Sequence, residues 1–199
     1  MKKNILVLLF WVLTFNLSAS GLPEFSTAGF YELPNTGREV YSMNLAWRFI
    51  KGDVSGTPYA TDFDDSGWEV VSLPHGLEYL PVEASGCVNY QGIAWYRKRF
   101  IPDDHLKGKQ LFVHFEAIMG KSEVYVNGQL LKKHYGRYLP VILDVTTLLK
   151  WGEENVIAVK TDNSDDPSYP VGKPQNLLDF TYFGGIYRDC WLVAHNDVF

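Results

Sequence analysis

Three short acidic runs contain the side chains whose type and spacing could do chemistry. Two carboxylates can hydrolyse a glycoside when they lie about 5–5.5 Å apart for retention of configuration, or about 6.5–9.5 Å apart for inversion. All three runs lie in turn-like stretches with Ser, Gly or Pro nearby, which favours solvated turn and cap residues over a catalytic pair. The runs are at Asp62–Asp65, Asp103–Asp104 and Asp165–Asp166.

The sequence has none of the other common catalytic or metal-binding signatures. Nucleophilic catalysis needs a serine or cysteine beside a histidine base, but no GxSxG pattern occurs and Cys87 lies in no such signature. Gly184 and Gly185 precede a strand pattern, whereas a phosphate-binding loop precedes a helix. No HExxH or CxxC pattern occurs either, so the sequence does not favour a zinc site.

The two cysteines, Cys87 and Cys190, lie far apart in the sequence. An exported protein can join such a pair in a disulfide, but isolated cysteines are also common as buried apolar side chains. Because the sequence does not give the distance between their Cα atoms, both states stay open.

The N-terminus has the three-part layout of a secretory signal peptide. Lys2 and Lys3 precede an eleven-residue apolar run at residues 5–15, and the small residues of 18–20 follow it. This run is shorter than the roughly 20 apolar residues that a transmembrane helix needs. We therefore expect residues 1–20 to be a signal peptide, with no membrane span and with export to the periplasm or the cell exterior.

The composition is that of a globular domain. The 199 residues correspond to one domain, at roughly 150 residues per domain. The formal net charge of −5 argues against nucleic acid as a partner, because binding to phosphates needs a basic surface. Aromatic residues make up 15% of the chain, and aromatic side chains favour strands.

Alternation of apolar and polar residues with a period of two predicts an all-β fold. In the expected strand at 93–101, Trp95 points away from the face that carries Tyr96 and Phe100. Asn127-Gly128 separates two β-prone runs and predicts a type I′ hairpin turn. Further strands are expected at 40–50, 68–73, 109–116, 122–131, 141–145, 155–162 and 186–195, with single helical turns at 57–65 and 146–151. Short strands separated by turns are typical of a sandwich or barrel.

The chain divides into three parts. Residues 1–20 are the expected signal peptide, residues 21–38 form a polar N-terminal lead-in, and residues 39–199 form the β domain. Within that domain, residues 163–179 make a long loop with three prolines. Long loops in compact domains are usually functional, so this loop is the first place to expect a site.

Four groups of motifs stand in order along almost the whole mature chain. They are Trp47-Arg48-Phe49 with residues 62–68 (DFDDSGW) and Leu73-Pro74-His75; residues 92–100 (GIAWYRKRF); residues 115–117 with 124–128 (VYVNG) and 144–146; and residues 179–189 (DFTYFGGIYRD). Together they resemble the N-terminal domain of glycoside hydrolase family 2, the β-galactosidase and β-glucuronidase family. The resemblance implies a jelly-roll β-sandwich of the galactose-binding-domain-like kind, usually called the sugar-binding domain.

The resemblance also implies residues that contact substrate. In β-galactosidases of this family, an aspartate ten residues before the aspartate of the final strand reaches the active-site mouth. It contacts substrate hydroxyls there and helps to hold a monovalent cation. Asp179 and Asp189 keep that spacing, and a carboxylate can accept hydrogen bonds from two vicinal hydroxyls; the alternative for Asp179 is a loop residue that caps a turn. A second contact comes from the loop at 83–91, where Asn89 is the best polar candidate.

The family's catalytic machinery has no counterpart in the sequence. Family catalysis uses two glutamates on a (β/α)₈ barrel of about 250 residues, which follows the sandwich and an immunoglobulin-like domain. No position matches the motifs of those glutamates, so we expect no catalytic residue and no hydrolysis by this chain alone. The resemblance implies the two missing domains and a β-galactoside-like carbohydrate as partners. It implies no cofactor in this chain, but Na⁺, K⁺ or Mg²⁺ in the full enzyme.

Three hypotheses about function follow. The first is the non-catalytic domain of an exported β-galactosidase-like enzyme that hydrolyses O-glycosidic bonds, and the aromatic stretch before Gly184 resembles the galactosidase branch. The second is a free-standing carbohydrate-binding module, and the third is a structural or interaction sandwich without a ligand. A reading frame that continues beyond codon 199 into a barrel would favour the first.

Overall fold

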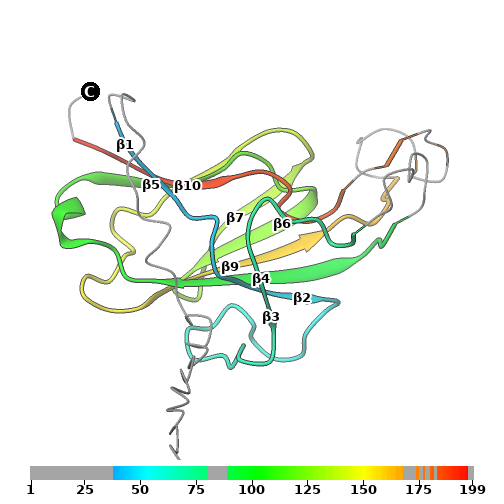
Figure 1. The fold of residues 1–199 in the computed structure, drawn as a ribbon, viewed down its shortest axis with the longest axis horizontal. Coiled ribbons are helices and arrows are strands. Elements are labelled where there is room, and N and C mark those ends of the chain that lie inside the picture. The colour runs from blue at the N-terminus through cyan, green and yellow to red at the C-terminus, as the bar shows by residue number, and fades with distance from the viewer. Residues whose placement is uncertain are drawn as a thin grey trace, which may run out of the picture.

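The protein forms strands throughout the part of the chain that the structure describes (Figure 1). The structure is a computed structural model, and it describes residues 38–79, 89–167, 174, 177, 180–181 and 183–196. The strands are β1 (Glu39–Ser42), β2 (Trp47–Lys51), β3 (Glu69–Val71), β4 (Ile93–Phe100), β5 (Gln110–Phe115), β6 (Gly120–Val126), β7 (Gln129–Gly136), β8 (Val141–Asp144), β9 (Asn155–Asp162) and β10 (Cys190–His195). A 3₁₀ turn, η1, spans Asp104–Leu106.

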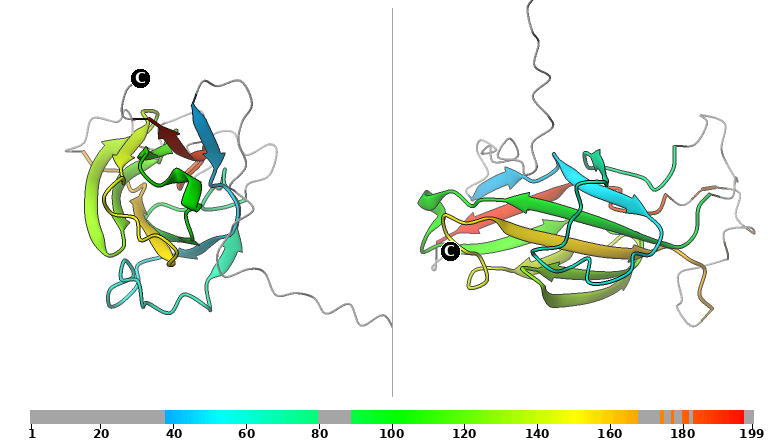
Figure 2. Two further views of the ribbon diagram at one scale, coloured as in Figure 1. Left: turned by 90° about the vertical axis from the view of Figure 1, so that its left-hand side faces the viewer. Right: turned by 90° about the horizontal axis from the view of Figure 1, so that it is seen from below.

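The strands form two antiparallel sheets that face one another across a core (Figure 2). One sheet has four strands in the order β1-β10-β5-β8, and the other has six in the order β3-β2-β4-β9-β6-β7. Apolar side chains from the inner faces of both sheets make one continuous core, which is how two packed sheets remove apolar surface from water. The predicted all-β sandwich is confirmed.

The four strands at the sheet edges are either short or charged. β3 has three residues, and β1 and β8 have four each. β7 is longer, with eight residues, but it includes Lys132 and Lys133. Its register with β6 also shifts between Val124 and Tyr125.

β4 and β9 pair in the middle of the six-stranded sheet and are buried on both faces. Tyr96 and Phe100 point into the main core. Trp95 points to the opposite face, where it packs with Trp68 and Tyr125 in a second apolar cluster. The predicted placement of aromatic side chains on both faces of this strand is therefore confirmed.

The connection between β2 and β3 covers the outer face of the six-stranded sheet. Tyr59 of this connection stacks on Tyr125 of β6, with ring centroids 4.6 Å apart. Phe63 meets Trp68 edge-on at 5.7 Å. The outer face is therefore a second, smaller core, which lies beneath a segment without regular secondary structure (cyan, at the bottom of Figure 1).

A buried ion-pair network fastens this covering segment to the sheet. Arg97 Nε donates to Asp65 Oδ2 at 2.6 Å, and Arg99 Nη2 lies 3.1 Å from Asp65 Oδ1. Arg97 is fully buried and also donates to the carbonyl oxygens of Pro58 and Ala60. The prediction that the run at 62–65 is solvated was wrong for Asp65, which is only 4% exposed, because two arginines of β4 reach out to its carboxylate.

The hairpin between β6 and β7 turns at the predicted position. Asn127 and Gly128 both have positive φ, 50° and 85°, as a type I′ turn requires. The Asn127 side chain donates to the carbonyl oxygen of Leu148 at 2.9 Å and accepts from the N–H of Val156 at 2.9 Å. The turn residue therefore also holds the segment that leads into β9.

Lys98 and Cys190 are ionisable side chains that lie inside the sandwich. Lys98 is fully buried, and its Nζ donates to the carbonyl oxygen of Leu45 at 2.7 Å. Burial lowers the pKa of Lys98 to about 8, and burial raises the pKa of the nearby Cys190 thiol. Cys87 lies outside the described residues, so the choice between a disulfide and two separate thiols stays open.

Four predicted segments differ from the structure. The expected strand at 40–50 divides into β1 and β2, because Ala46 takes a positive φ of 56° between them. The expected strand at 186–195 begins only at Cys190. The expected helical turns at 57–65 and 146–151 are non-helical turns and bends. Residues 1–20 and nearly all of the lead-in lie outside the described residues, and none of the described helices is long and apolar enough to cross a membrane.

Candidate functional site

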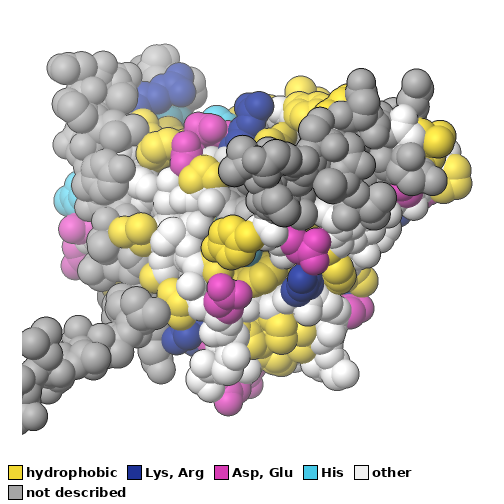
Figure 3. All heavy atoms as spheres, turned by 45° about the vertical axis from the view of Figure 1, so that its right-hand side comes forward, with side chains coloured by type: hydrophobic (Ala, Val, Ile, Leu, Met, Phe, Trp, Pro, Cys, Tyr) yellow, Lys and Arg dark blue, Asp and Glu magenta, His cyan; other side chains and the backbone are white. Residues whose placement is uncertain are grey.

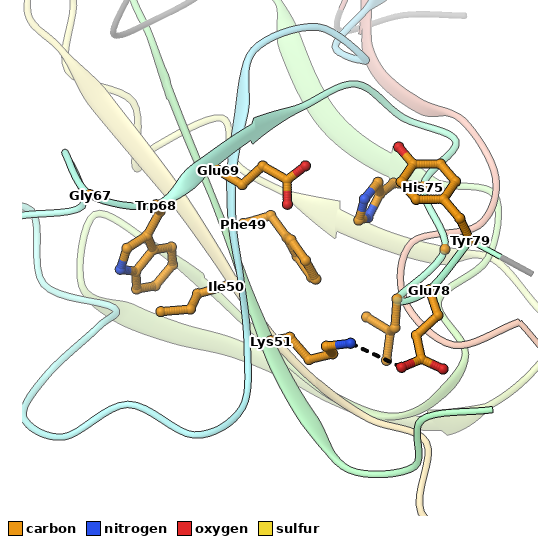
Figure 4. Close-up of a pocket in the computed structure, with 11 residues that line it drawn as sticks. Phe49, Ile50, Lys51, Gly67, Trp68, Glu69, His75, Glu78 and Tyr79 are labelled. Atoms are coloured by element: carbon orange, nitrogen blue, oxygen red, sulfur yellow. Dashed lines mark hydrogen bonds and ion pairs between the residues drawn. The ribbon is translucent and has the colours of Figure 1, made fainter.

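A groove lies at the edge of the six-stranded sheet, between β2 and the segment that follows β3 (Figure 4). Its volume is about 630 Å³, within the range of roughly 300–1,000 Å³ that small-molecule sites occupy. Aromatic and charged side chains both line it, among them Phe49, Lys51, Trp68, Glu69, His75 and Glu78. Figure 3 shows one face of the molecule, on which hydrophobic side chains are exposed among acidic and basic ones.

One wall of the groove is held in place by the segment before β10. The N–H of His75 donates to the carbonyl oxygen of Ile186 at 2.9 Å, and that of Leu77 donates to Gly184 at 3.2 Å. Between these contacts Gly185 has φ +93°, and a Cβ there would lie 2.9 Å from the carbonyl oxygen of His75. Only glycine fits this close approach, which explains the glycine pair in the sequence.

His75 is held by hydrogen bonds at the back of the groove. Its Nδ1 lies 2.9 Å from the Tyr96 hydroxyl oxygen, which also accepts from the backbone of Ile186. We assign the hydroxyl proton to the hydrogen bond with Nδ1, which leaves the imidazole proton on Nε2. Burial lowers the pKa of His75, and the Glu69 carboxylate opposes part of that shift. The imidazole is therefore neutral at pH 7.

The opposite end of the groove carries an ion pair. Lys51 Nζ lies 2.9 Å from Glu78 Oε1, while Glu78 Oε2 accepts from the backbone N–H of Tyr90 at 2.8 Å. These hydrogen bonds, first from Lys51 and then from Tyr90, lower the pKa of Glu78. Glu78 thus joins the groove to the segment that enters β4.

Asn89 lies in that segment, at the end of the sandwich where β4 begins and β9 ends. It is half-buried. The residues next to it are fixed by Asn163, whose Oδ1 accepts from the N–H of Gly92 and whose Nδ2 donates to the carbonyl oxygen of Tyr90, both at 2.8 Å. The backbone beside Asn89 is therefore held from two sides, by Glu78 and by Asn163.

The other predicted site residue, Asp179, lies outside the described residues, so the structure does not show how far it is from Asn89. The carboxylate ten positions later has a structural role, because Asp189 Oδ1 accepts from Asn44 Nδ2 at 2.7 Å. Arg188 is exposed and lies over the ring of Tyr187, with its guanidinium carbon 5.6 Å from the ring centroid.

The groove has no signature in the sequence. His75 and Trp68 occur in the quoted motifs, but a motif does not show which side chains share a cavity. Glu69, Lys51 and Glu78 carry no sequence signal of their own. Glu69 and Lys51 are placed by the pairing of β3 and β4 with β2, and Glu78 is placed by the fold of the segment after β3. Within the described residues, no group of three or more His, Cys, Asp or Glu side chains could hold a metal ion.

Comparison with known proteins gives a consistent result. The family model described as "Glycosyl hydrolases family 2, sugar binding domain" matches residues 57–196. A β-galactosidase of Thermoanaerobacter pseudethanolicus is 40% identical over 163 residues, which is 81% of this chain and 21% of the relative. A β-glucuronidase of Formosa agariphila is 34% identical, over 80% of this chain and 17% of the relative.

Solved structures resemble this one in the same way. The crystal structure of Bacteroides uniformis β-glucuronidase matches with a TM-score of 0.69 and 31% identity, over 80% of this chain and 18% of that one. A putative β-galactosidase from Bacteroides fragilis matches with a TM-score of 0.64 and 37% identity, over 80% and 23%. The chain thus spans about one fifth of the length of the proteins it matches.

Proposed function

The chain belongs to glycosyl hydrolase family 2 as its non-catalytic sugar-binding domain, and we propose that it serves a longer enzyme that cleaves β-galactosides or β-glucuronides. The observation that carries this proposal is the family match over residues 57–196, together with relatives that bear both activities in their names. Because the chain spans only 17–21% of those relatives, hydrolysis is proposed for the longer protein.

The proposed task of this domain is to contact the sugar at the mouth of the enzyme's active site, through Asn89 and Asp179. A contact residue must be positioned before the substrate arrives, and the backbone on either side of Tyr90 is fixed by Glu78 and Asn163. Asp179 is also the residue that we propose would help to hold a monovalent cation at this mouth.

We expect Asp179→Ala to lower kcat/KM of the full-length enzyme about tenfold, equivalent to roughly 1.4 kcal/mol of lost transition-state stabilisation. A carboxylate that accepts from two sugar hydroxyls in the transition state loses both hydrogen bonds on this change. The effect is measured by steady-state kinetics with nitrophenyl β-galactoside and nitrophenyl β-glucuronide. The protein assayed is the full-length enzyme, encoded by the reading frame that continues beyond codon 199.

Asp104→Ala is the matched control for Asp179→Ala. Asp104 lies in η1, beyond the other end of β4, where it pairs with Lys107 at 2.8 Å. This variant should keep the wild-type kcat/KM. Equal activity of Asp179→Ala and wild type would reject the substrate contact, and a frame without a barrel would reject the proposal as a whole.

We also propose that the enzyme is exported and that residues 1–20 are removed. The support is the sequence of charged, apolar and small residues at the N-terminus. Mass spectrometry of the protein recovered from its native cells should give a mature N-terminus at Gly21. Recovery of the intact N-terminus from the cytoplasm would contradict export.

A further inference from the structure

The groove beside β2 contains an acceptor and a donor that have no hydrogen-bond partner among the described residues. The Glu69 carboxylate makes no hydrogen bond or ion pair with any residue that the structure describes, and it points toward the imidazole of His75 in Figure 4. The Nε2 of His75 likewise has no hydrogen-bond partner there, because only Nδ1 is used, by Tyr96. An acceptor and a donor thus face the same space.

The floor between these two polar groups is apolar and rigid. The Phe49 ring packs against His75, with centroids 4.6 Å apart, and against Tyr96 at 4.9 Å. Trp68 closes one end of the groove, and the exposed Tyr79 lies at the other. Hydroxyl-binding groups above an aromatic floor suit a ligand that has both hydroxyl groups and an apolar C–H face, which is the chemistry of a pyranose ring.

The charges of the groove select among such ligands. Lys51 and Glu78 neutralise one another at 2.9 Å, and the imidazole of His75 is neutral at pH 7. Glu69 therefore leaves the groove with one net negative charge. A second carboxylate inside the groove would be repelled at short range, so the groove favours a neutral sugar over a uronate.

We propose that the groove between β2 and the segment after β3 binds a neutral pyranose unit, with Glu69 accepting from a ring hydroxyl and His75 Nε2 donating to one. This site lies along the edge of the six-stranded sheet, and its ligand needs no catalytic barrel, whereas the contact proposed for Asn89 and Asp179 needs the longer enzyme. It deepens the carbohydrate-binding role of the domain, and it discriminates between the two glycoside classes that the relatives' names contain.

The test uses the full 199-residue chain and two ligands that differ only at C6. Phenyl β-D-glucoside carries a neutral CH₂OH there, and phenyl β-D-glucuronide carries a carboxylate. In ¹H–¹⁵N NMR titrations, we expect the glucoside to shift the Trp68 indole N–H and the backbone amides of residues 67–78. The glucuronide should bind at least tenfold more weakly. Phenyl β-D-galactoside, a second neutral ligand, should shift the same signals as the glucoside.

Two substitutions at Glu69 separate its charge from its hydrogen bond. Glu69→Gln keeps an acceptor oxygen without the charge, so the glucuronide should approach the affinity of the glucoside. Glu69→Ala removes the acceptor, so glucoside binding should weaken about tenfold. Glu69 is exposed on a three-residue edge strand, and dispersion of the amide spectrum checks that both variants fold. Glu153→Gln makes the same charge change in an exposed turn before β9, and it should leave binding unchanged.

Three outcomes would overturn the inference. They are no shift in the groove signals at saturating glucoside, equal wild-type affinity for glucoside and glucuronide, and shifts confined to residues 89–92. The last result would leave the proposed contact at Asn89 standing and reject the groove alone. Conversely, groove binding that survives Asn89→Ala would support the groove whatever the outcome for the longer enzyme.

Discussion

Asp65→Ala is expected to lower the free energy of unfolding by about 3–5 kcal/mol, the usual cost of removing one partner from a buried ion pair. The Arg97 side chain is fully buried, and Asp65 neutralises its charge at 2.6 Å. Loss of the Asp65 carboxylate therefore leaves an uncompensated charge without access to solvent. Without the carboxylate, Arg97 keeps only the carbonyl oxygens of Pro58 and Ala60 as acceptors. Equilibrium unfolding in urea, followed by tryptophan fluorescence, measures the change.

Two further variants identify the cause of that loss. Asp62→Ala alters an exposed residue of the same acidic run, and it should leave the unfolding midpoint unchanged. Asp65→Ala combined with Arg97→Met removes the uncompensated charge and fills the space with apolar atoms, so it should recover part of the lost stability. A double variant less stable than Asp65→Ala alone would show that the buried charge is not the main cost.

Lys98→Met should change the way stability depends on pH. Burial lowers the pKa of Lys98 to about 8 in the folded protein, whereas an unfolded lysine titrates near 10.4. Between these values the unfolded chain binds more protons, so the contribution of Lys98 to stability rises with pH. At about 1.4 kcal/mol per unit of pKa, the wild type should gain about 2–3 kcal/mol relative to the variant between pH 7 and pH 10.

The comparison with Lys98→Met follows the titration of Lys98 together with its effect on Cys190, because the two groups interact. Burial raises the pKa of Tyr96, so Tyr96 lowers the stability of both proteins alike as the pH rises through the range in which an unfolded tyrosine titrates. Lys150→Met, which alters an exposed lysine, should follow the wild-type curve. Parallel stability curves for wild type and Lys98→Met would show that the buried amine is not perturbed in the folded state.

The sequence predicts those features of this fold that depend on neighbouring residues. The alternation of side chains along a strand placed Tyr96 and Trp95 on opposite faces, and Asn127-Gly128 located the hairpin, because both signals come from the local backbone. The resemblance to family 2 rested on motifs of this kind, and the family match confirms it. Asn89 and Asp179 stay predictions, because no described contact tests either of them.

The features that the sequence analysis missed all depend on distant contacts. Asp65 lies 32 residues before Arg97, and nothing in the run at 62–65 distinguishes the buried carboxylate from its solvated neighbours. Glu69 and His75 line the same groove because the backbone after β3 turns back and His75 bonds to Ile186. Contacts of this kind have no periodic signature, so only the fold reveals them.

The short and charged edge strands bear on how the domain behaves when many copies of it are close together. An open edge offers unpaired N–H and C=O groups to any other strand, and long, flat, apolar edges lead to aggregation. In this protein β1, β3 and β8 offer at most four residues each, and β7 offers two consecutive lysines and an irregular register. These edges therefore disfavour strand pairing between copies of the chain that stand side by side on one polysome.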